Sequence, residues 1–224
     1  MLLQEVFNQL TFGELSQLSI GGGEAGVIDS TNHHRIIPHV NLALGALYSR
    51  FPLKEGRATV ALLGGKYTYA LQVEDLNRIG RVFTAKGHEL TLNDELDRYS
   101  CFTVSSRVLT VPVDIVDGAT NLPEALITGS LDITYRANHP KLQEIDPDFD
   151  PDEIELELPY THLNALLYFI AARMLAPTGS GQFEGLVSNS YIQKYEREVQ
   201  LLTANNPQVE LTSNTTGFRR GGWS

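Results

Sequence analysis

The stretch LPYTHLNALLYFIAARML, Leu158 to Leu175, is the most apolar run in the chain and decides how the chain folds. Its apolar residues recur three or four positions apart, which is the spacing of one helix face. Aromatic and small residues fill the other side, and a helix that is apolar nearly all round is covered by neighbours on several faces. We therefore expect a buried helix; its stripe is Leu163, Leu166, Leu167, Ile170, Ala171 and Met174, with Tyr168, Phe169 and Ala172 opposite.

This run does not have the properties of a membrane span. A span needs about 20 apolar residues, whereas the run contains His162 and Asn164 and ends at Arg173 and Pro177. No Lys or Arg precedes Arg35, so the N-terminus lacks the pattern of a signal or transit peptide. The sequence predicts no contact with a membrane.

The composition is that of a globular protein. The chain has 224 residues, of which 42% are hydrophobic and 20% charged, which is enough for one domain, or for one domain with an inserted partner. Cys101 is the only cysteine. An internal disulfide and a cysteine-based zinc cluster are therefore excluded, and a reducing compartment fits.

The net charge of -10 comes mostly from one place. Eight of the 27 acids lie between Glu144 and Glu157, where there is no Lys or Arg. Proteins that wrap nucleic acid carry basic stripes instead. The charge pattern argues against a protein that grips DNA, although DNA could pass nearby.

Both ends of the chain have helical patterns. The first 18 residues predict a broken helix with one apolar face, and Thr11 has the capping-box spacing for a second short turn with Glu14. Ile20 to Gly26, IGGGEAG, predicts a flexible connection. A second helix is expected over Asp29 to Phe51, capped by its first residues, with Pro38 at a kink or in the first turn.

Near the C-terminus two more helices are expected, over Pro159 to Ala176 and over roughly Gly185 to Ala204. The last one is amphipathic, because Tyr191, Tyr195 and Val199 share one face. The tail, from Asn205, is rich in Asn, Thr and Gly and predicts no regular structure.

Between these ends the period changes from helical to alternating. Ala58 to Leu71 predicts a hairpin around Gly64 and Gly65. Further strands are expected at Arg81 to Ala85, Cys101 to Val113 and Ser130 to Arg136.

The predicted fold class is α+β: a helical bundle from the N- and C-terminal helices, an inserted antiparallel β subdomain and an extended C-terminal arm. The expected parts are N-terminal helices (1–56), the β subdomain (57–140), an acidic connection (141–158), the C-terminal helix pair (159–204) and the arm (205–224).

No residue pattern specifies a reaction or a cofactor. The glycines of IGGGEAG lack the strand and the Gly-Lys-Ser/Thr of a phosphate loop. His33, His34 and His39 do not form an HExxH motif, so exposed or capping histidines are favoured over a metal site. Cys101 lies in an apparent strand and is expected to be a buried apolar residue rather than a nucleophile.

The acidic connection has part of a calcium-loop pattern. Asp146, Asp148, Asp150 and Glu157 occupy its first, third, fifth and twelfth positions, but Pro151 stands where that loop needs glycine. An acidic surface loop is the favoured interpretation, so no metal is expected.

Three segments, taken in order, resemble the head-to-tail connector proteins, or adaptors, of tailed bacteriophages, most closely those of short-tailed phages. They are LDITYRANHPKL (131–142), ELELPYTHLNALLYFIAARMLAP (155–177) and YIQKYEREVQLLTANN (191–206), followed by the polar tail. The triple glycine that begins at Gly21 is not part of the resemblance.

The resemblance implies a structural virion protein at the head-tail interface, assembled in the host cytoplasm. It implies a ring, usually of twelve copies, below the portal, which extends the DNA channel without sequence-specific binding and serves as a platform for the next tail or nozzle protein. The expected partners are the portal protein, copies of the chain and that tail component.

Candidate contact residues follow from the resemblance and from residue type. Aromatic and Arg side chains anchor interfaces, so the arm residues expected on the portal are Phe218, Arg219, Arg220 and Trp223. Ring or portal contacts are expected from Tyr191, Tyr195 and Arg197. If acids face the lumen or rim, like charge would repel DNA phosphate; those acids are Asp146, Asp148, Asp150 and Asp152.

Two other classes of function stay open at this point. One is another virion ring or tail-tube component, and the other is a soluble metal-dependent hydrolase that uses His33, His34 and His39.

Overall fold

A computed structural model describes residues 1–16, 28, 32–143, 150–175 and 182–205, with the side chains of 182–186 left out. The chain forms two compact units. The helical unit comprises the described residues of Met1–Phe51 and Lys141–Ser224, and the β unit is Pro52–Pro140. The predicted α+β class is confirmed.

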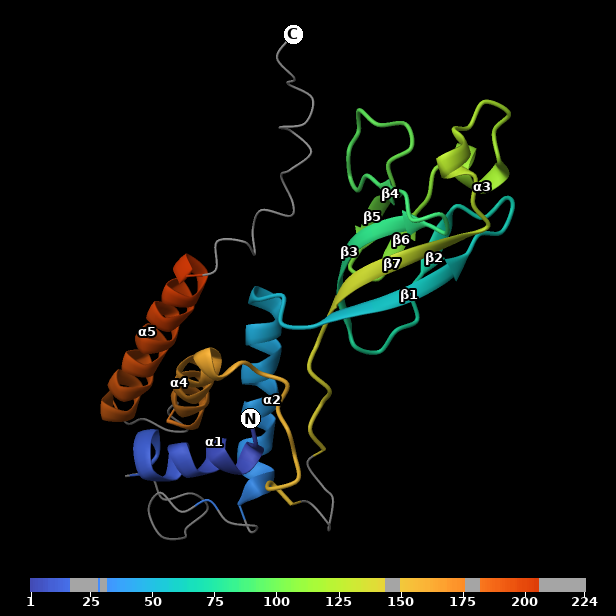
Figure 1. The fold of residues 1–224 in the computed structure, drawn as a ribbon. Coiled ribbons are helices and arrows are strands. Elements are labelled where there is room, and N and C mark those ends of the chain that lie inside the picture. Colours follow the sequence, from blue (N-terminus) through green and yellow to red (C-terminus); the bar gives the residue numbers. More distant parts are fainter. Residues whose placement is uncertain (17–27, 29–31, 144–149, 176–181, 206–224) are drawn as a thin grey trace. The chain divides into compact units, whose positions relative to one another are not determined.

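The buried helix expected from the most apolar stretch is the centre of the helical unit. It is α4 (Leu163–Met174), preceded by a 3₁₀ turn at Tyr160–His162. Figure 1 shows α4 beside the other helices, and it contacts all of them. These are α1 (Leu3–Gln9), α2 (His33–Arg50), α5 (Gln182–Asn205) and a π-helix at Leu10–Glu14 that continues α1.

The helices form where sequence and packing agree. Leu3, Val6, Phe7 and Leu10 are all buried, which confirms the apolar face at the N-terminus. On α4 the alanines Ala165 and Ala171 are fully buried, and their small side chains let neighbouring helices approach closely.

Residues of the acidic connection cap α1. The backbone N–H of Leu3 donates to the carbonyl oxygen of Ile154 at 2.9 Å, and that of Gln4 to Pro151 at 3.2 Å. These bonds satisfy N–H groups that have no partner within a helix. On α2, the Asn41 side chain exchanges two hydrogen bonds with the backbone of Leu142, at 3.0 and 2.9 Å, and the Tyr48 hydroxyl donates to the carbonyl oxygen of Glu157.

The β unit contains two antiparallel sheets. The first has the strand order β1 (Glu55–Ala61), β7 (Ser130–Ala137), β3 (Leu76–Thr84) and β4 (Glu89–Leu90); the second has the order β2 (Thr68–Ala70), β6 (Val108–Thr110) and β5 (Phe102–Ser105). A short helix, α3 (Val113–Asp117), follows β6. Apolar residues from both sheets and from α3 form one core.

The hairpin predicted over Ala58 to Leu71 is wrong. Its two halves are β1 and β2, which belong to different sheets: β1 pairs with β7, and β2 pairs with β6. The turn at the glycines does form, and Gly65 has a positive φ of 76°. The turn therefore connects one sheet to the other instead of joining a hairpin, because each of the two strands pairs with a strand distant in sequence.

Smaller corrections concern the N-terminal half. Thr11 does not cap a separate turn, since it lies inside the π-helix. Pro38 is the sixth residue of α2, beyond its first turn, and α2 begins at His33. The caps expected at Asp29, Ser30 and Thr31 lie outside the described residues, as does IGGGEAG.

Candidate interaction surfaces

The aromatic residues of α5 pack mainly inside the helical unit. Tyr195 is 6% exposed, and its ring meets Phe169 edge-on with centroids 5.2 Å apart. The guanidinium of Arg50 lies 5.4 Å from the centroid of the same ring. In this structure Tyr195 is therefore buried, because its ring fills the space between α4, α5 and the end of α2, and its contact with a partner stays a prediction.

Tyr191 is half-buried and belongs to a second aromatic contact. The ammonium of Lys194 lies 4.4 Å from its ring centroid and 5.4 Å from that of Tyr168, which is a cation–π arrangement. Burial is the main reason that the pKa of the Tyr191 hydroxyl is raised above its ordinary value. Of the three predicted contact residues on α5, Arg197 alone is exposed.

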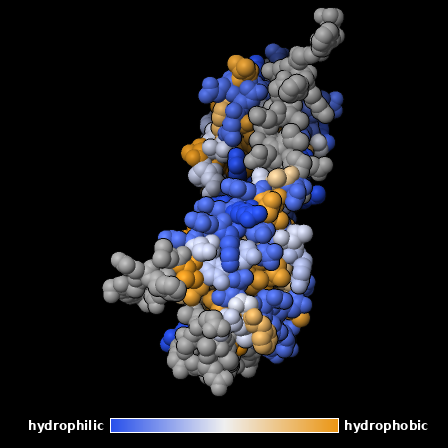
Figure 2. Space-filling view, turned by 90° about the vertical axis from the view of Figure 1, so that its left-hand side faces the viewer, coloured by the Kyte–Doolittle hydropathy of each residue, from blue (hydrophilic) through white to orange (hydrophobic). Residues whose placement is uncertain are grey.

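The outer surface of α5 is mostly polar. Figure 2 looks on to the side of the helical unit that carries α5 and shows apolar residues as separate groups between hydrophilic ones. Ile192 and Leu201 are the large apolar residues of α5 that are exposed in the described part, at 42% and 47%. They lie nine positions apart, on opposite sides of a helix, so they form no continuous apolar stripe.

The predicted anchors of the arm, Phe218, Arg219, Arg220 and Trp223, lie outside the described residues. So do Asp146 and Asp148, whereas Asp150 and Asp152 are exposed. The calcium-loop pattern is therefore only partly placed.

The three clustered histidines do not share one environment. His34 is exposed at the start of α2. His39 is half-buried and its Nδ1 has no hydrogen-bond partner among the described residues; burial, and then the charge of Arg173, lower its pKa. No group of three His, Cys, Asp or Glu residues suited to a metal ion occurs in the described ranges.

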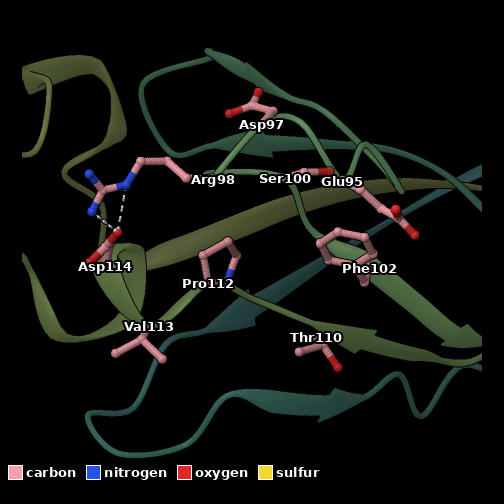
Figure 3. A pocket seen from close by; sticks show the side chains of 9 residues that line it. All are labelled: Glu95, Asp97, Arg98, Ser100, Phe102, Thr110, Pro112, Val113 and Asp114. Atoms are coloured by element: carbon pink, nitrogen blue, oxygen red, sulfur yellow. Dashed lines mark hydrogen bonds and ion pairs between the residues drawn. The ribbon is translucent and has the colours of Figure 1, made fainter.

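A hollow of about 360 Å³ opens on the β unit (Figure 3). Pro112 and Phe102 lie in its middle, and Arg98 and Asp114 close one side through a hydrogen bond of 3.0 Å from the guanidinium Nε. Glu95 lies on the opposite side. Among the described residues that line the hollow, no hydroxyl or thiol is hydrogen-bonded to a basic group.

Cys101 is fully buried, as expected, and burial raises the pKa of its thiol to about 12. None of the helices in the described residues is both long and apolar enough to cross a bilayer.

A family model described as SU10 adaptor protein matches residues 10–219 of the chain. The chain belongs to the SU10 adaptor protein family. This is a family of phage head-tail adaptors, so the protein is a structural protein of the virion at the junction of head and tail. The resemblance to phage adaptors is thereby confirmed.

No curated protein matches this SU10 adaptor. Among solved structures, a chain of the "Virion of native gene transfer agent (GTA) particle" is 13% identical to it. That match covers 84% of this chain and 87% of the other, with a TM-score of 0.28.

Proposed function

We propose that this adaptor forms a closed ring, of twelve copies, below the portal of a phage head. The ring extends the DNA channel and carries the next tail or nozzle protein. Its C-terminal arm reaches the portal, with Phe218, Arg219, Arg220 and Trp223 as anchors.

The observation that carries this proposal is the reach of the family match. It extends from residue 10 to residue 219 and so includes Phe218 and Arg219 of the arm. Helix α5 ends at Asn205, and 206–224 is the segment that we propose as the arm. Nineteen residues span up to about 60 Å when extended, which is enough to reach a neighbouring protein.

The helical unit is suited to a ring wall. Its central helix is covered on several sides within one chain, so the unit does not depend on a partner for its core. Arg197, exposed on α5, stays a proposed contact residue, and Tyr191 is proposed as a partly exposed one. In a closed ring of identical subunits, each subunit contacts its two neighbours through two different surfaces.

Removing residues 206–224 tests the arm. The shortened chain keeps α5, so we expect it to fold with an unchanged circular dichroism spectrum and to lose binding to its own portal. Binding is measured by electron microscopy and by co-sedimentation of the mixture, in which the full chain should add a ring below the portal.

A full-length control separates the anchors from the length of the arm. Replacing Phe218, Arg219, Arg220 and Trp223 by alanine should abolish portal binding, while replacing Thr212, Thr215 and Thr216 by alanine should not. Unchanged binding by the shortened chain would refute the role of the arm. Binding to tail-tube protein in place of portal would assign the ring to another part of the tail.

A further inference from the structure

Four arginines lie together on one face of the four-stranded sheet of the β unit. Arg136 on β7 lies directly between Glu55 on β1 and Arg78 on β3. Two positions along, Thr134 lies between Arg57 and Arg81. We call the set Arg57, Arg78, Arg81 and Arg136 the arginine face; strands β1, β7 and β3 run side by side in Figure 1.

This face points away from the core of the β unit. Along β7 the buried residues Leu131, Ile133 and Tyr135 alternate with the less buried positions that include Thr134 and Arg136. Arg57, Arg78 and Arg81 are exposed. Their side chains are therefore free to meet another molecule.

The folding of the β unit does not explain these charges. The side chains of Arg57, Arg78 and Arg136 make no ion pair or hydrogen bond with any described residue. Arg81 has one, a 3.9 Å contact from its Nε to Glu89, with both side chains about half exposed. Like charges directly opposite each other destabilise a sheet, so the Arg78–Arg136 pair is unfavourable for the pairing of β3 with β7, although Glu55 lies opposite Arg136 on its other side, and an anion bound over the pair would be stabilising.

Guanidinium groups bind carboxylates and phosphates through paired hydrogen bonds. The arginine face spans three strands, or about 10 Å, which suits an extended chain of negative charges rather than one small ion. The partner should therefore be a polyanion.

The same chain carries a polyanion on its helical unit. Residues 150–157 of the acidic connection hold five acids, all exposed, and no base. Asp150, Asp152, Glu153 and Glu155 form no ion pair with a described residue. Residues 151–153 of this segment form a turn, and backbone bonds from Leu3 to Ile154 and from Leu156 to Met1 hold the part that follows beside the start of α1.

We propose that the arginine face of one copy binds the acidic segment 150–157 of the next copy in the ring, an inference that rests on the ring proposed above. Such a contact joins two different surfaces, so it repeats head to tail and can close into a ring. It assigns Asp150 and Asp152 to the subunit contact instead of the lumen. DNA phosphate is the alternative ligand, and the net charge of -10, most of which lies in residues 144–157, disfavours it.

The proposed contact fixes how neighbouring subunits are oriented more than it adds to the affinity between them. Exposed ion pairs add little affinity each, but like charges brought together act strongly against a wrong pairing. The ring should therefore form less well as salt rises from about 0.1 M to about 1 M, since the Debye length falls from about 10 Å to about 3 Å.

Charge reversal on full-length protein tests the contact. One variant carries Arg78→Glu and Arg136→Glu, a second carries Glu153→Arg and Glu155→Arg, and a third carries all four changes. We expect the first two to form at least tenfold fewer rings on the portal at about 0.1 M salt, and the third to recover to within about twofold of the original. Arg107→Glu with Lys66→Glu, a change of the same charge outside the arginine face, should leave ring yield unchanged.

A milder variant guards against misfolding. Arg78→Gln removes the repulsion with Arg136, so it should unfold at the same or a higher temperature and still reduce ring yield. If the original chain makes no ring on its portal, the proposed function fails. If it makes rings and neither reversed pair reduces them, or the fourfold variant does not recover, this inference alone is overturned.

The alternative ligand has its own readout. Binding of a fluorescent double-stranded DNA probe is measured by anisotropy for the original chain and for the Arg78→Glu, Arg136→Glu variant. We expect no difference between them. Loss of DNA binding in that variant, with ring yield unchanged, would make the face a nucleic-acid surface and overturn the carboxylate assignment.

Discussion

At the second position of β1, the ring of Tyr135 lies where the Cβ of any residue other than Gly56 would be. The tyrosine hydroxyl donates to the Asp75 carboxylate at 3.1 Å, which ties the ring in place. Glycine is needed here for close approach and not for an unusual backbone angle. Gly45, on the exposed side of α2, is the contrasting case, because a Cβ there would meet nothing within 4 Å.

Alanine at these two positions should have opposite effects. Gly56→Ala overlaps the Tyr135 ring and should lower the free energy of unfolding by about 1–3 kcal/mol. Gly45→Ala should raise it by up to about 1 kcal/mol, because alanine favours a helix over glycine. Urea unfolding followed by circular dichroism measures both; an unaffected Gly56→Ala protein would show that Tyr135 can move aside.

A buried histidine should make the helical unit sensitive to acid. His162 is 3% exposed and packs edge-on against Phe51, with ring centroids 4.9 Å apart. Its Nδ1 lies 3.1 Å from the Thr161 hydroxyl oxygen, and its Nε2 has no hydrogen-bond partner among the described residues. Burial lowers its pKa below the ordinary value of 6.5, because the charged ring is poorly solvated.

The sign of the effect follows from proton binding. Below pH 6.5 the unfolded chain takes up a proton that the folded chain resists, so the free energy of unfolding falls as the pH falls from 6.5 to the lowered folded pKa. Chemical unfolding between about pH 5 and pH 7.5 should show this slope. It should be shallower in His162→Leu and unchanged in His34→Gln, which alters an exposed ring; equal slopes in all three proteins would contradict the assignment.

Among the elements, the position of α4 can be predicted from its own residues, whereas the pairing of β1 with β7 cannot. The position of α4 follows from its composition, since an apolar helix of this length has to be covered. The partner of β1 does not, because a strand of alternating residues fits many partners of the same pattern. Here β1 pairs with β7, which is more than sixty residues away in the sequence, while the nearby β2 belongs to the other sheet.

In the β unit, the reactivity of the buried Cys101 thiol reports how often this unit unfolds. Cys101 lies just before β5, is fully buried, and has a thiol pKa of about 12. Because the thiolate is the reactive form, a thiol reagent at neutral pH should label the folded protein at least ~100-fold more slowly than the urea-unfolded protein.

A matched thiol checks access. In a Cys101→Ser background, Ser106→Cys places the single cysteine at the exposed turn between β5 and β6 and should react at once. Gly56→Ala should speed the labelling of Cys101, since both sites lie in the β unit. Fast labelling of the folded original chain would show that the β unit opens readily.

At the scale of the whole molecule, both chain ends build one unit and the middle builds the other. The helical unit contains the described residues of Met1–Phe51 and Lys141–Ser224, and the β unit is the intervening segment. The Asn41 side chain holds the returning chain at Leu142 through two hydrogen bonds across a separation of 101 residues. The predicted ring contact uses both units, since the arginine face belongs to one and the acidic segment to the other.

The sequence alone determined the fold class, the burial of α4, the ends of the long helices to within a few residues and the resemblance to phage adaptors. These depend on the periodicity within each segment and on the order of the segments along the chain, and both can be read without knowing which residues are in contact. Tertiary structure decided the pairing of β1 with β7, the burial of Tyr195, the bonds of Asn41 and the gathering of Arg57, Arg78, Arg81 and Arg136 on one face. Each of these depends on strand register or on packing between residues far apart in the chain, and no pattern in a single segment encodes which distant segment becomes its neighbour.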